Sequence, residues 1–410
     1  MQADQARFLV DNPLAAERAT LSLERGIPLL TLRKMLEREH DPDQCRALLD
    51  CAQARLRFAQ KFERAHLWLL TGTAAEQASP WPVAHWRAER LSLLRPASTV
   101  VEFGCGIGGD TVFLTRKLTV RALERCPARA LLCSYNVETL GCRDRFTLEG
   151  STRELEALEG EVLYCDPARR SHQRLSSFHE WEPPLPRVLS LISTGRFAIV
   201  AVKCAPGLDL DLPPLDDLRF EASFISVNGE LKECFLIAGS GSSAKRAVML
   251  SSEGGAPITL ESSGIEIPPA APRSGLYLHN PDPAVLRAKA LDTLAVGLKA
   301  GQPHRKIGYL IGPTPCPDQR AHSFLIEDSF PLKWSHLKKR MSQSGWSEFE
   351  YLGRGVPFSQ EEVRAKLPRL KRGKGAVHRG TIVVYREDQG YRVIMARRVG
   401  KETEPRPQAL

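Results

Sequence analysis

The apolar residues of the first 95 positions recur at helical spacing. Three- and four-residue steps mark two stretches of this segment: Leu29, Leu32, Met35 and Leu36, followed by Leu49, Ala52, Leu56 and Ala59. Such a period predicts amphipathic helices. The tripeptide 80–82, Pro-Trp-Pro, interrupts the pattern, and residues 83–94 predict a further amphipathic helix. We therefore expect a helical N-terminal domain over residues 1–95.

Beyond residue 95, short apolar runs alternate with segments of helical spacing. The runs that predict strands are 99–103, 118–123, 145–148, 161–165 and 197–203. Residues 127–139 predict a helix among them, and this alternation predicts a parallel, doubly wound sheet whose ligands bind at the carboxyl ends of the strands. Two more runs, 224–227 and 233–238, flank Asn228-Gly229, a strong hairpin signal. We expect this α/β domain to span residues 96–240.

The rest of the chain divides into smaller segments. Residues 241–272 predict a polar, strand-rich extension that ends in a stiff proline-rich linker. Residues 275–321 predict a small α+β, ferredoxin-like module, and residues 322–400 predict a second, basic α+β module. A chain of 410 residues exceeds one ordinary core, so several domains are expected.

Composition favours a cytoplasmic protein. No apolar run approaches the roughly 20 residues that span a bilayer, and the first residues lack the profile of a signal peptide. The ten cysteines are scattered without any Cys-x-x-Cys pair, so neither a zinc motif nor a redox motif is predicted. Free thiols in a reducing compartment are the simplest interpretation. We expect no membrane partner and no metal, and the sequence leaves the oligomeric state open.

The positive charge is concentrated at the C-terminal end. Residues 301–410 hold 21 Lys and Arg against 11 Asp and Glu, whereas residues 1–300 hold 36 against 37. A basic segment beside a near-neutral body is typical of an RNA-binding arm, because phosphates supply most of the affinity. A solvated basic face or a loose tail is the alternative. The candidate RNA-binding residues are Lys338, Lys339, Arg340, Arg369, Lys371, Arg372 and Lys374.

Residues 100–110, Val-Val-Glu-Phe-Gly-Cys-Gly-Ile-Gly-Gly-Asp, carry the strongest chemical signal. A short strand enters a glycine loop that lets a ligand approach the backbone closely. The glycines also satisfy the dinucleotide pattern Gly-x-Gly-x-x-Gly. Glu102 separates the alternatives, because a carboxylate suits the ammonium and sulfonium of S-adenosylmethionine (SAM) and is unfavourable beside a pyrophosphate. Class I SAM-dependent methyltransferases resemble this pattern, and the candidate cofactor residues are Glu102, Gly104, Cys105, Gly106, Gly108 and Asp110.

Polar residues at the next strand ends extend this candidate site. Glu124, followed by Arg125, ends the second strand, and its carboxylate can accept both hydroxyls of a ribose. Asp166-Pro167 follows the fourth strand. Asp166 can accept hydrogen bonds from a target amine, and Pro167 stiffens the turn. A structural role, in which Asp166 pairs with a neighbouring arginine to hold a turn, is the alternative.

The segment 166–169, Asp-Pro-Ala-Arg, resembles the Asn/Asp-Pro-Pro-aromatic motif of amino-methylating members of the class. The aromatic residue that stacks on the base is missing, and Arg169 is the candidate to stack on a base or to contact a phosphate. Methylation of cytosine at carbon 5 instead needs a cysteine nucleophile. Cys165 and Cys204 lie at strand ends, but enzymes of that kind present Pro-Cys where this chain has Asp-Pro. We interpret Cys165 as a core residue.

Several segments together resemble a bacterial family of class I methyltransferases that carry a C-terminal THUMP-like domain. The segments that carry the resemblance are Lys61-Phe62, Glu76–Ser79, Val83–Ala88, Glu102–Thr111, Asp166–Arg170, Lys203–Asp209, Gly229–Glu233 and Tyr277–Ala288. The resemblance implies a Rossmann-like sheet with SAM as cofactor, and a helical domain that covers the cofactor mouth, with Gln77 and Arg87 as candidate contacts. A plain packing role for these two residues is the alternative. Segment 322–400 is the implied THUMP-like module. The third strand of the family usually ends in Gly-Asp, whose acid meets the adenine amine, so Ser151 or Thr152 is expected to serve here.

The sheet is also similar to that of RNA guanine-N2 methyltransferases. The hypothesis is therefore direct methyl transfer from SAM to a base amino group of RNA, with Asp166, Pro167 and Arg169 at the reaction centre. Much of the rate should come from proximity and alignment, since the donor is already activated. A protein or small-molecule methyltransferase and a non-catalytic RNA-binding protein with a relic pocket are the alternatives. A dehydrogenase is disfavoured by Glu102.

Overall fold

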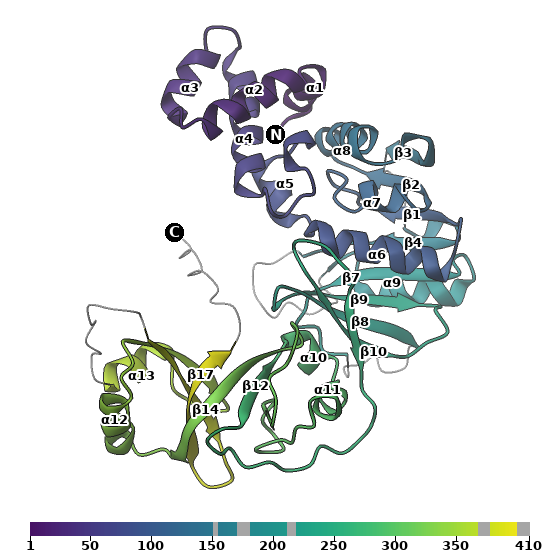
Figure 1. Cartoon of the computed structure of the whole chain (residues 1–410). Helices are drawn as coiled ribbons and strands as arrows, with labels where there is room; N and C mark the ends of the chain where they lie inside the picture. The colour runs from purple at the N-terminus through teal and green to yellow at the C-terminus, as the bar shows by residue number, and fades with distance from the viewer. Residues whose placement is uncertain (151–154, 170–180, 211–218, 368–377, 400–410) are drawn as a thin grey trace. The chain divides into compact units, whose positions relative to one another are not determined.

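The computed structural model describes residues 1–150, 155–169, 181–210, 219–367 and 378–399. The chain falls into two compact units (Figure 1). Unit 1 comprises Met1–Val227, Lys232–Ala244 and Leu250–Pro257, and unit 2 comprises Asn228–Leu231, Lys245–Met249 and Ile258–Leu410. Among the described residues, no helix combines the length and the apolar character that crossing a membrane requires.

Helices fill the N-terminal part of unit 1, as the apolar spacing predicts, and we call residues 1–95 the helical head. The helices are α1 (Ala3–Asp11), α2 (Pro13–Glu24), α3 (Leu29–Leu36), α4 (Pro42–Arg57), the 3-10 helix η1 (Ala65–Leu67), α5 (Gly72–Gln77) and α6 (Trp81–Leu94). Helix α4 begins at a capping box, in which Asp41 Oδ1 accepts the backbone N–H groups of Asp43 and Gln44, both at 2.9 Å. Packing of buried leucines on these helices supplies most of their stability.

The strands of unit 1 form a mixed sheet. They are β1 (Thr99–Phe103), β2 (Thr119–Glu124), β3 (Phe146–Gly150), β4 (Val162–Cys165), β7 (Ile199–Cys204), β8 (Phe220–Val227) and β9 (Glu230–Ala238). Their order is β8-β9-β7-β4-β1-β2-β3, with parallel pairs from β7 to β3 and an antiparallel pair of β9 with β7. All seven predicted strands are confirmed, with ends displaced by a few residues. The order reverses between β1 and β4, the switch point where doubly wound sheets bind ligands.

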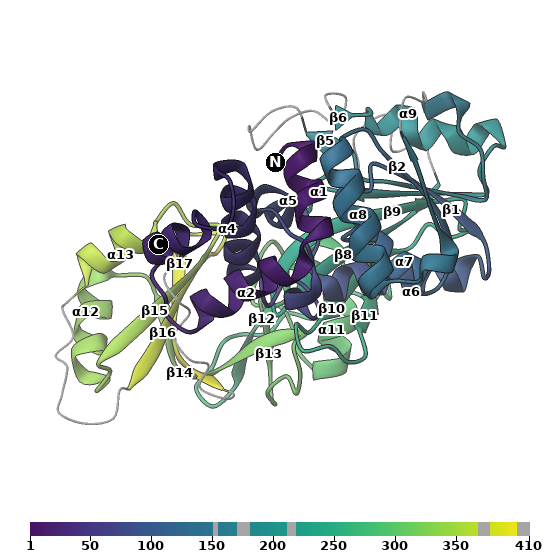
Figure 2. The ribbon, with the colours of Figure 1, turned by 90° about the horizontal axis from the view of Figure 1, so that it is seen from above.

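Helices and short elements connect the strands of this sheet. They are α7 (Thr111–Thr115), α8 (Pro127–Leu140), η2 (Arg143–Arg145), η3 (Leu155–Ala157), α9 (Leu185–Ser190), η5 (Leu191–Thr194) and the antiparallel pair of β5 (Ala168–Arg169) with β6 (Trp181–Glu182). Seen from above, α1 of the helical head lies beside α8 (Figure 2). Strands β4 and β7 are buried along their whole length, as expected for parallel strands with both faces covered.

One buried amide fastens the helical head to the sheet. Asn136 of α8 donates from Nδ2 to the carbonyl oxygens of Leu69, at 3.1 Å, and of Ile107, at 2.9 Å. Its Oδ1 accepts the backbone N–H of Leu69 at 2.8 Å. Leu69 belongs to the helical head and Ile107 to the glycine loop, so Asn136 holds these two segments together. Each such hydrogen bond contributes about 1 kcal/mol, and an unpaired partner would cost more.

The elements after β9 include a second sheet, which lies in unit 2. They are β10 (Lys245–Leu250), β11 (Ile258–Glu261), β12 (Tyr277–Pro281), α10 (Pro283–Arg287), α11 (Leu291–Leu298), β13 (Leu310–Gly312), β14 (Ala321–Pro331), α12 (Trp334–Gln343), β15 (Glu348–Arg354), α13 (Gln360–Lys366), β16 (Arg379–Arg386) and β17 (Tyr391–Val399). The order in the second sheet is β13-β12-β14-β17-β16-β15. Segments 275–321 and 322–400, predicted as separate modules, therefore contribute strands to one sheet.

The second sheet has a core on each face. Along β16, Ile382 and Val384 pack into one cluster together with Met341 of α12. Val383 and Tyr385 pack into the other cluster. This alternation follows from the two-residue period of a strand. Both faces are therefore apolar, although the surrounding sequence is basic.

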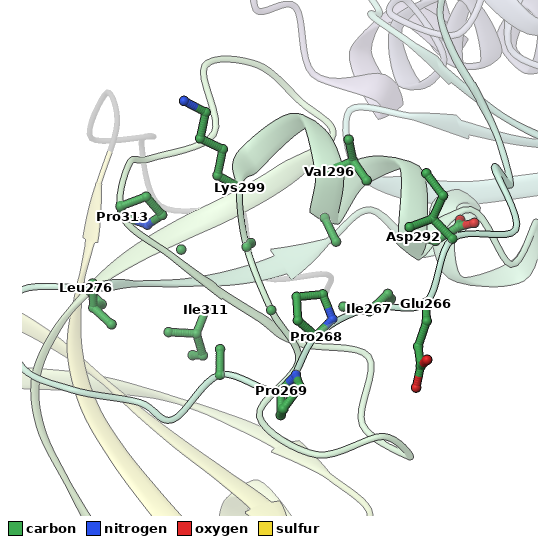
Figure 3. Close-up of a pocket in the computed structure, with 16 residues that line it drawn as sticks. Glu266, Ile267, Pro268, Pro269, Leu276, Asp292, Val296, Lys299, Ile311 and Pro313 are labelled. Atoms are coloured by element: carbon green, nitrogen blue, oxygen red, sulfur yellow. The ribbon is translucent and has the colours of Figure 1, made fainter.

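A cavity of about 500 Å³ opens in unit 2 between the proline-rich linker and α11 (Figure 3). Asp292 of α11 holds the chain at its rim, because its Oδ2 accepts the backbone N–H groups of Ser263, at 2.8 Å, and Gly264, at 2.7 Å. The apolar lining includes Ile267, Pro268, Pro269, Leu276, Val296, Ile311 and Pro313. None of the described residues predicted to bind cofactor or RNA lines this cavity.

Candidate active site

The carboxyl ends of four parallel strands meet at one edge of the sheet in unit 1. Phe103 of β1 pairs with Leu123 of β2 and with Cys165 of β4. Cys165 pairs in turn with Val202 of β7. The residues one step further along these strands are Gly104, Glu124, Asp166 and Lys203. The structure thus brings three of the predicted site residues to one edge and adds Lys203 to them.

The glycine loop after β1 leaves open space next to its backbone. Gly104 and Gly106 have φ angles of +84° and +59°, and a Cβ at either position would meet no atom within 4 Å. This region of φ costs little only for glycine. Gly108 differs, because a Cβ there would lie 3.1 Å from the Sγ of Cys133 in α8. Gly104 and Gly106 leave room for a ligand, whereas Gly108 lets α8 approach the loop.

Glu102 lies in β1, two residues before the glycine loop, and is only 2% exposed. Its Oε2 accepts a hydrogen bond from Thr111 Oγ1 at 2.8 Å. Burial, reinforced by the nearby Asp110 carboxylate, raises the pKa of Glu102 to about 8. A carboxyl group in these surroundings is protonated at neutral pH and becomes a carboxylate when a cation is placed beside it.

Glu124 is oriented by two backbone N–H groups. Its Oε2 accepts from Gly106 at 2.9 Å, and its Oε1 accepts from Cys126 at 2.8 Å. A carboxylate has about four acceptor positions, so both oxygens can still accept a ribose hydroxyl. The other two predicted residues here differ in exposure. Cys105 is buried, and Arg125 is 76% exposed, with its guanidinium 3.7 Å from the Glu182 carboxylate.

Arg87 of α6 is buried among carboxylates. Its Nη1 donates to both oxygens of Glu233, at 2.7 and 2.6 Å, and its Nη2 donates to Asp110. Burial opposes the guanidinium charge, but Asp110 and Glu233 outweigh this effect and raise the pKa of Arg87. Arg87 therefore orients Asp110 at the end of the glycine loop. Its expected direct contact with the cofactor stays a prediction.

Lys203, near the end of β7, links Asp110 to Asp166. Its Nζ lies 3.1 Å from Asp110 Oδ2 and also donates to Asp166 Oδ2. Burial opposes the ammonium charge, yet these two carboxylates raise the pKa of Lys203. Against the effect of burial, Arg87 and Lys203 hold the pKa of Asp110 below its ordinary value. The side chain of Asp166 is 46% exposed and that of Lys203 is 9% exposed, so the network ends in one open carboxylate.

The helical head reaches the glycine loop through the end of α5. A Cβ at Gly109 would lie 3.3 Å from the Cβ of Ala78, the residue after Gln77. Gln77 itself is exposed, and its contact with the cofactor stays a prediction. Pro167, after Asp166, is buried. Ser151 lies outside the described part of the chain. The backbone of Arg169 is described, but its side chain is not.

Lys61 of the helical head lies near Lys203. The sequence assigns no functional role to Lys61, which occurs there only in one of the segments that resemble the family. Its Nζ donates to the carbonyl oxygen of Glu76 at 2.6 Å. Burial, reinforced by the ammonium groups of Lys232 and Lys203, lowers the pKa of Lys61 to about 8. Because these ammonium groups repel one another, an additional cation near them is unfavourable.

The two cysteines considered as nucleophiles are core residues. Cys165 and Cys204 are buried, and burial raises the pKa of both thiols. A neutral, inaccessible thiol is a poor nucleophile. The interpretation of Cys165 as a packing residue is confirmed.

The predicted RNA-binding residues are described in part. Lys338, Lys339 and Arg340 are exposed on α12 of unit 2. Arg340 forms an ion pair with Asp328 of β14. The other four lie outside the described residues: Arg369, Lys371, Arg372 and Lys374.

The architecture of unit 1 defines a class of protein. A parallel sheet with one antiparallel strand, a glycine loop after β1 and an acidic residue at the end of β2 are the features of a Rossmann-like class I methyltransferase. A solved structure of an inferred methyltransferase from Porphyromonas gingivalis W83 has this fold, with a TM-score of 0.70 and 20% identity over 88% of this chain and 92% of that chain. The predicted fold class is confirmed.

Comparison of the sequences gives the family. No family model matches the chain. Two proteins of Mycobacterium tuberculosis, from strains CDC 1551/Oshkosh and ATCC 25618/H37Rv, are each described as an uncharacterized S-adenosylmethionine-dependent methyltransferase. Both are 30% identical to this chain over 313 residues, which cover 73% of this chain and 81% of the relative. The chain belongs to this family of SAM-dependent methyltransferases.

SAM is the cofactor of this family, and the residues present fit it. The open space beside Gly104 and Gly106 can receive a ligand, Glu102 can neutralise its ammonium, and Glu124 can accept ribose hydroxyls. SAM supplies a methyl group on a sulfonium, which is already activated for transfer. What remains for the protein is to bind the donor and to align an acceptor with it.

Proposed function

We propose that this protein methylates RNA at an amino group of a base, with guanine N2 as the first assignment. The observation that carries the proposal is the half-exposed Asp166 carboxylate, which follows β4 next to the strand that bears the glycine loop. A carboxylate at this place can accept a hydrogen bond from an amine held in line with the methyl group. The basic segment 322–400 is proposed as the THUMP-like module that binds the RNA.

The proposed reaction needs little acid–base chemistry. With SAM bound, the acceptor nitrogen would form the new bond to the methyl carbon, the electron pair of the carbon–sulfur bond would stay on sulfur, and the methylated nitrogen would lose one proton to water. Asp166 accepts an N–H hydrogen bond and directs the nitrogen lone pair towards the methyl carbon. Pro167 restricts the turn that carries Asp166. Alignment of this kind can supply several kcal/mol of the barrier reduction.

The charge of the C-terminal segment supports RNA as the substrate. Residues 301–410 hold 21 basic against 11 acidic residues, and the described cations Lys338 and Lys339 are exposed on one helix. Exposed cations on a folded helix can contact phosphates at fixed positions. This favours a nucleic-acid surface over a loose basic tail.

The test is transfer of a tritiated methyl group from SAM to total RNA, separated afterwards into tRNA, rRNA and mRNA. We expect label in one fraction, and digestion to nucleosides then identifies the base. Asp166→Ala should abolish the label while SAM still binds in a parallel titration, because the acceptor contact is removed whereas Lys203 keeps Asp110 as its partner. Asp144→Ala, which changes an exposed carboxylate of η2 in the same unit, should leave the label unchanged.

Two outcomes would redirect the assignment. Turnover retained in Asp166→Ala would eliminate the role given to this carboxylate. Absence of label from every RNA fraction, with SAM still bound, would favour a protein or small-molecule acceptor or a binding-only role.

A further inference from the structure

The charged side chains behind Asp166 form a continuous series of ion pairs. Glu233 of β9 contacts Arg87 of α6, and Arg87 contacts Asp110 at the end of the glycine loop. Lys203 of β7 then joins Asp110 to Asp166. The first four side chains are at most 10% exposed, whereas that of Asp166 is 46% exposed. The series thus ends in one carboxylate that an acceptor can reach.

We propose that Lys203 determines acceptor specificity: by neutralising Asp166 it makes the site accept an uncharged nitrogen, such as a base amine, and reject a protonated alkylamine, such as a lysine side chain. This inference rests on the proposed transfer of a methyl group to an amine beside Asp166. It concerns how the site distinguishes an uncharged amine from a protonated one, which the proposed function does not explain.

The ion pair itself is the first argument. Lys203 Nζ donates to Oδ2 of Asp166 and is shared with Asp110, which Arg87 also contacts, so the negative charge of Asp166 already has a cationic partner. Oδ1 is then the oxygen expected to accept an N–H hydrogen bond. A neutral N–H needs only such an acceptor, whereas an ammonium would require an unpaired negative charge to offset the loss of its hydration.

The surrounding lysines are the second argument. Lys61, from the helical head, has a pKa lowered to about 8 by burial and by Lys232 and Lys203. The existing ammonium groups therefore already repel one another at this edge of the sheet. A protonated amine entering next to Asp166 would add to that repulsion.

The test compares two cofactor analogues and needs no acceptor. Sinefungin carries a protonated amine where the methyl-bearing sulfonium of SAM lies, whereas S-adenosylhomocysteine (SAH) carries a neutral sulfur. We expect the wild type to bind the two within a few-fold of each other. Lys203→Met should raise the ratio Kd(SAH)/Kd(sinefungin) about tenfold, because Asp166 then has no ammonium partner and attracts the cation. Titration calorimetry at pH 7 measures both constants, and SAH binding shows that the variant is folded.

Three further variants assign the effect. Lys203→Arg should keep the wild-type ratio, because the cation is retained. The double variant Lys203→Met with Asp166→Asn should lose the increase, because the effect acts through Asp166. Arg90→Met is the matched control, since Arg90 of α6 also pairs with a buried sheet carboxylate, Glu221 of β8, and Arg90 is not part of the series that ends in Asp166. It should leave the ratio unchanged.

The outcomes separate this inference from the proposed function. Two results would overturn the role of Lys203, whatever the RNA assay shows. The first is a ratio Kd(SAH)/Kd(sinefungin) for Lys203→Met equal to that of the wild type. The second is an equal rise of this ratio in Lys203→Met and in the double variant with Asp166→Asn. A strong preference of the wild type for sinefungin would also overturn it, even if Lys203→Met failed to fold. If RNA is not labelled but the ratios Kd(SAH)/Kd(sinefungin) are as expected, the proposed RNA substrate is wrong and the role of Lys203 stands, with an uncharged acceptor that is not RNA.

Discussion

Three carboxylates at the edge of the sheet differ in what they can do because their surroundings differ. Glu102 is buried beside Asp110 and is held as a neutral acid, ready to ionise next to a cation. Glu124 is oriented by two backbone N–H groups, so its direction is set before a ligand arrives. Asp166 is paired with Lys203 yet open to solvent. Residue type alone would assign the same chemistry to all three.

The pKa of Glu102 leads to a pH dependence of cofactor binding. If Glu102 pairs with the ammonium of SAH, as its position predicts, it does so as a carboxylate, whereas the free protein carries the protonated acid below its pKa of about 8. Binding therefore releases a proton at lower pH, and affinity is reduced there. We expect the ratio Kd(Glu102→Gln)/Kd(wild type) for SAH to rise by up to about tenfold per pH unit from pH 6 to 8 and to level off above that.

Dividing the Kd of Glu102→Gln by that of the wild type at each pH cancels the pH dependence that comes from titration of SAH itself, because both proteins bind the same ligand. Calorimetry in two buffers of different ionisation enthalpy should also detect the released proton for the wild type and not for the variant. A ratio that stays constant between pH 6 and 8 would contradict the assignment of Glu102 to the ammonium.

At the level of elements, the turn between β1 and α7 combines two different uses of glycine. Gly104 and Gly106 border open space, whereas Gly108 borders the Sγ of Cys133. All three have positive φ, so backbone strain alone cannot separate a binding role from a packing role. The space that a Cβ would occupy makes that distinction.

Gly104→Ala should weaken SAH binding by about tenfold or more, because the new methyl group enters the space left for the ligand. Gly26→Ala is the matched control, since Gly26 has φ +81° and open space but lies at the end of α2, away from the glycine loop. Both variants should lose about 1 kcal/mol of unfolding free energy from the positive φ, and only Gly104→Ala should lose affinity. Calorimetry and chemical denaturation measure the two effects. Equal affinities in the two variants would contradict a ligand beside Gly104.

At the level of the whole molecule, the basic excess and the methyltransferase sheet belong to different units. The sheet with its glycine loop lies in unit 1, and the exposed cations of α12 lie in unit 2. This division suits a protein that binds a polyanion with one part and performs chemistry with another. If RNA is the substrate, as proposed, RNA affinity and cofactor affinity should be separable by mutation.

Lys338→Ala with Lys339→Ala should weaken RNA binding and leave SAH binding unchanged. Loss of two phosphate contacts should reduce the slope of log K against log salt by about 1.4 for single-stranded RNA. Filter binding over a series of salt concentrations measures this slope. The control is Lys34→Ala with Arg38→Ala, which removes two exposed cations from the helical head. A slope unchanged by the α12 variant would argue against α12 as the RNA surface.

Much of the fold could be predicted because strands and glycine turns are encoded locally. The two-residue and 3.6-residue periods identify the strands of the first sheet and the helices around them, and Glu102 next to the glycines indicates the cofactor class. The boundary expected near residue 321 was less predictable. Pairing of β12 with β14 joins segments about 45 residues apart, and no local pattern shows which strands will pair.

The sequence by itself therefore determined the order of the elements, the glycine loop and the residues at the strand ends. Only the tertiary structure decided how the charges pair. Arg87, Asp110, Lys203 and Glu233 are dispersed over nearly 150 positions, and Asn136 joins Leu69 to Ile107 across the helical head and the loop. Ion pairing and burial depend on distances in space and on the exclusion of water, which arise only when the head packs on the sheet.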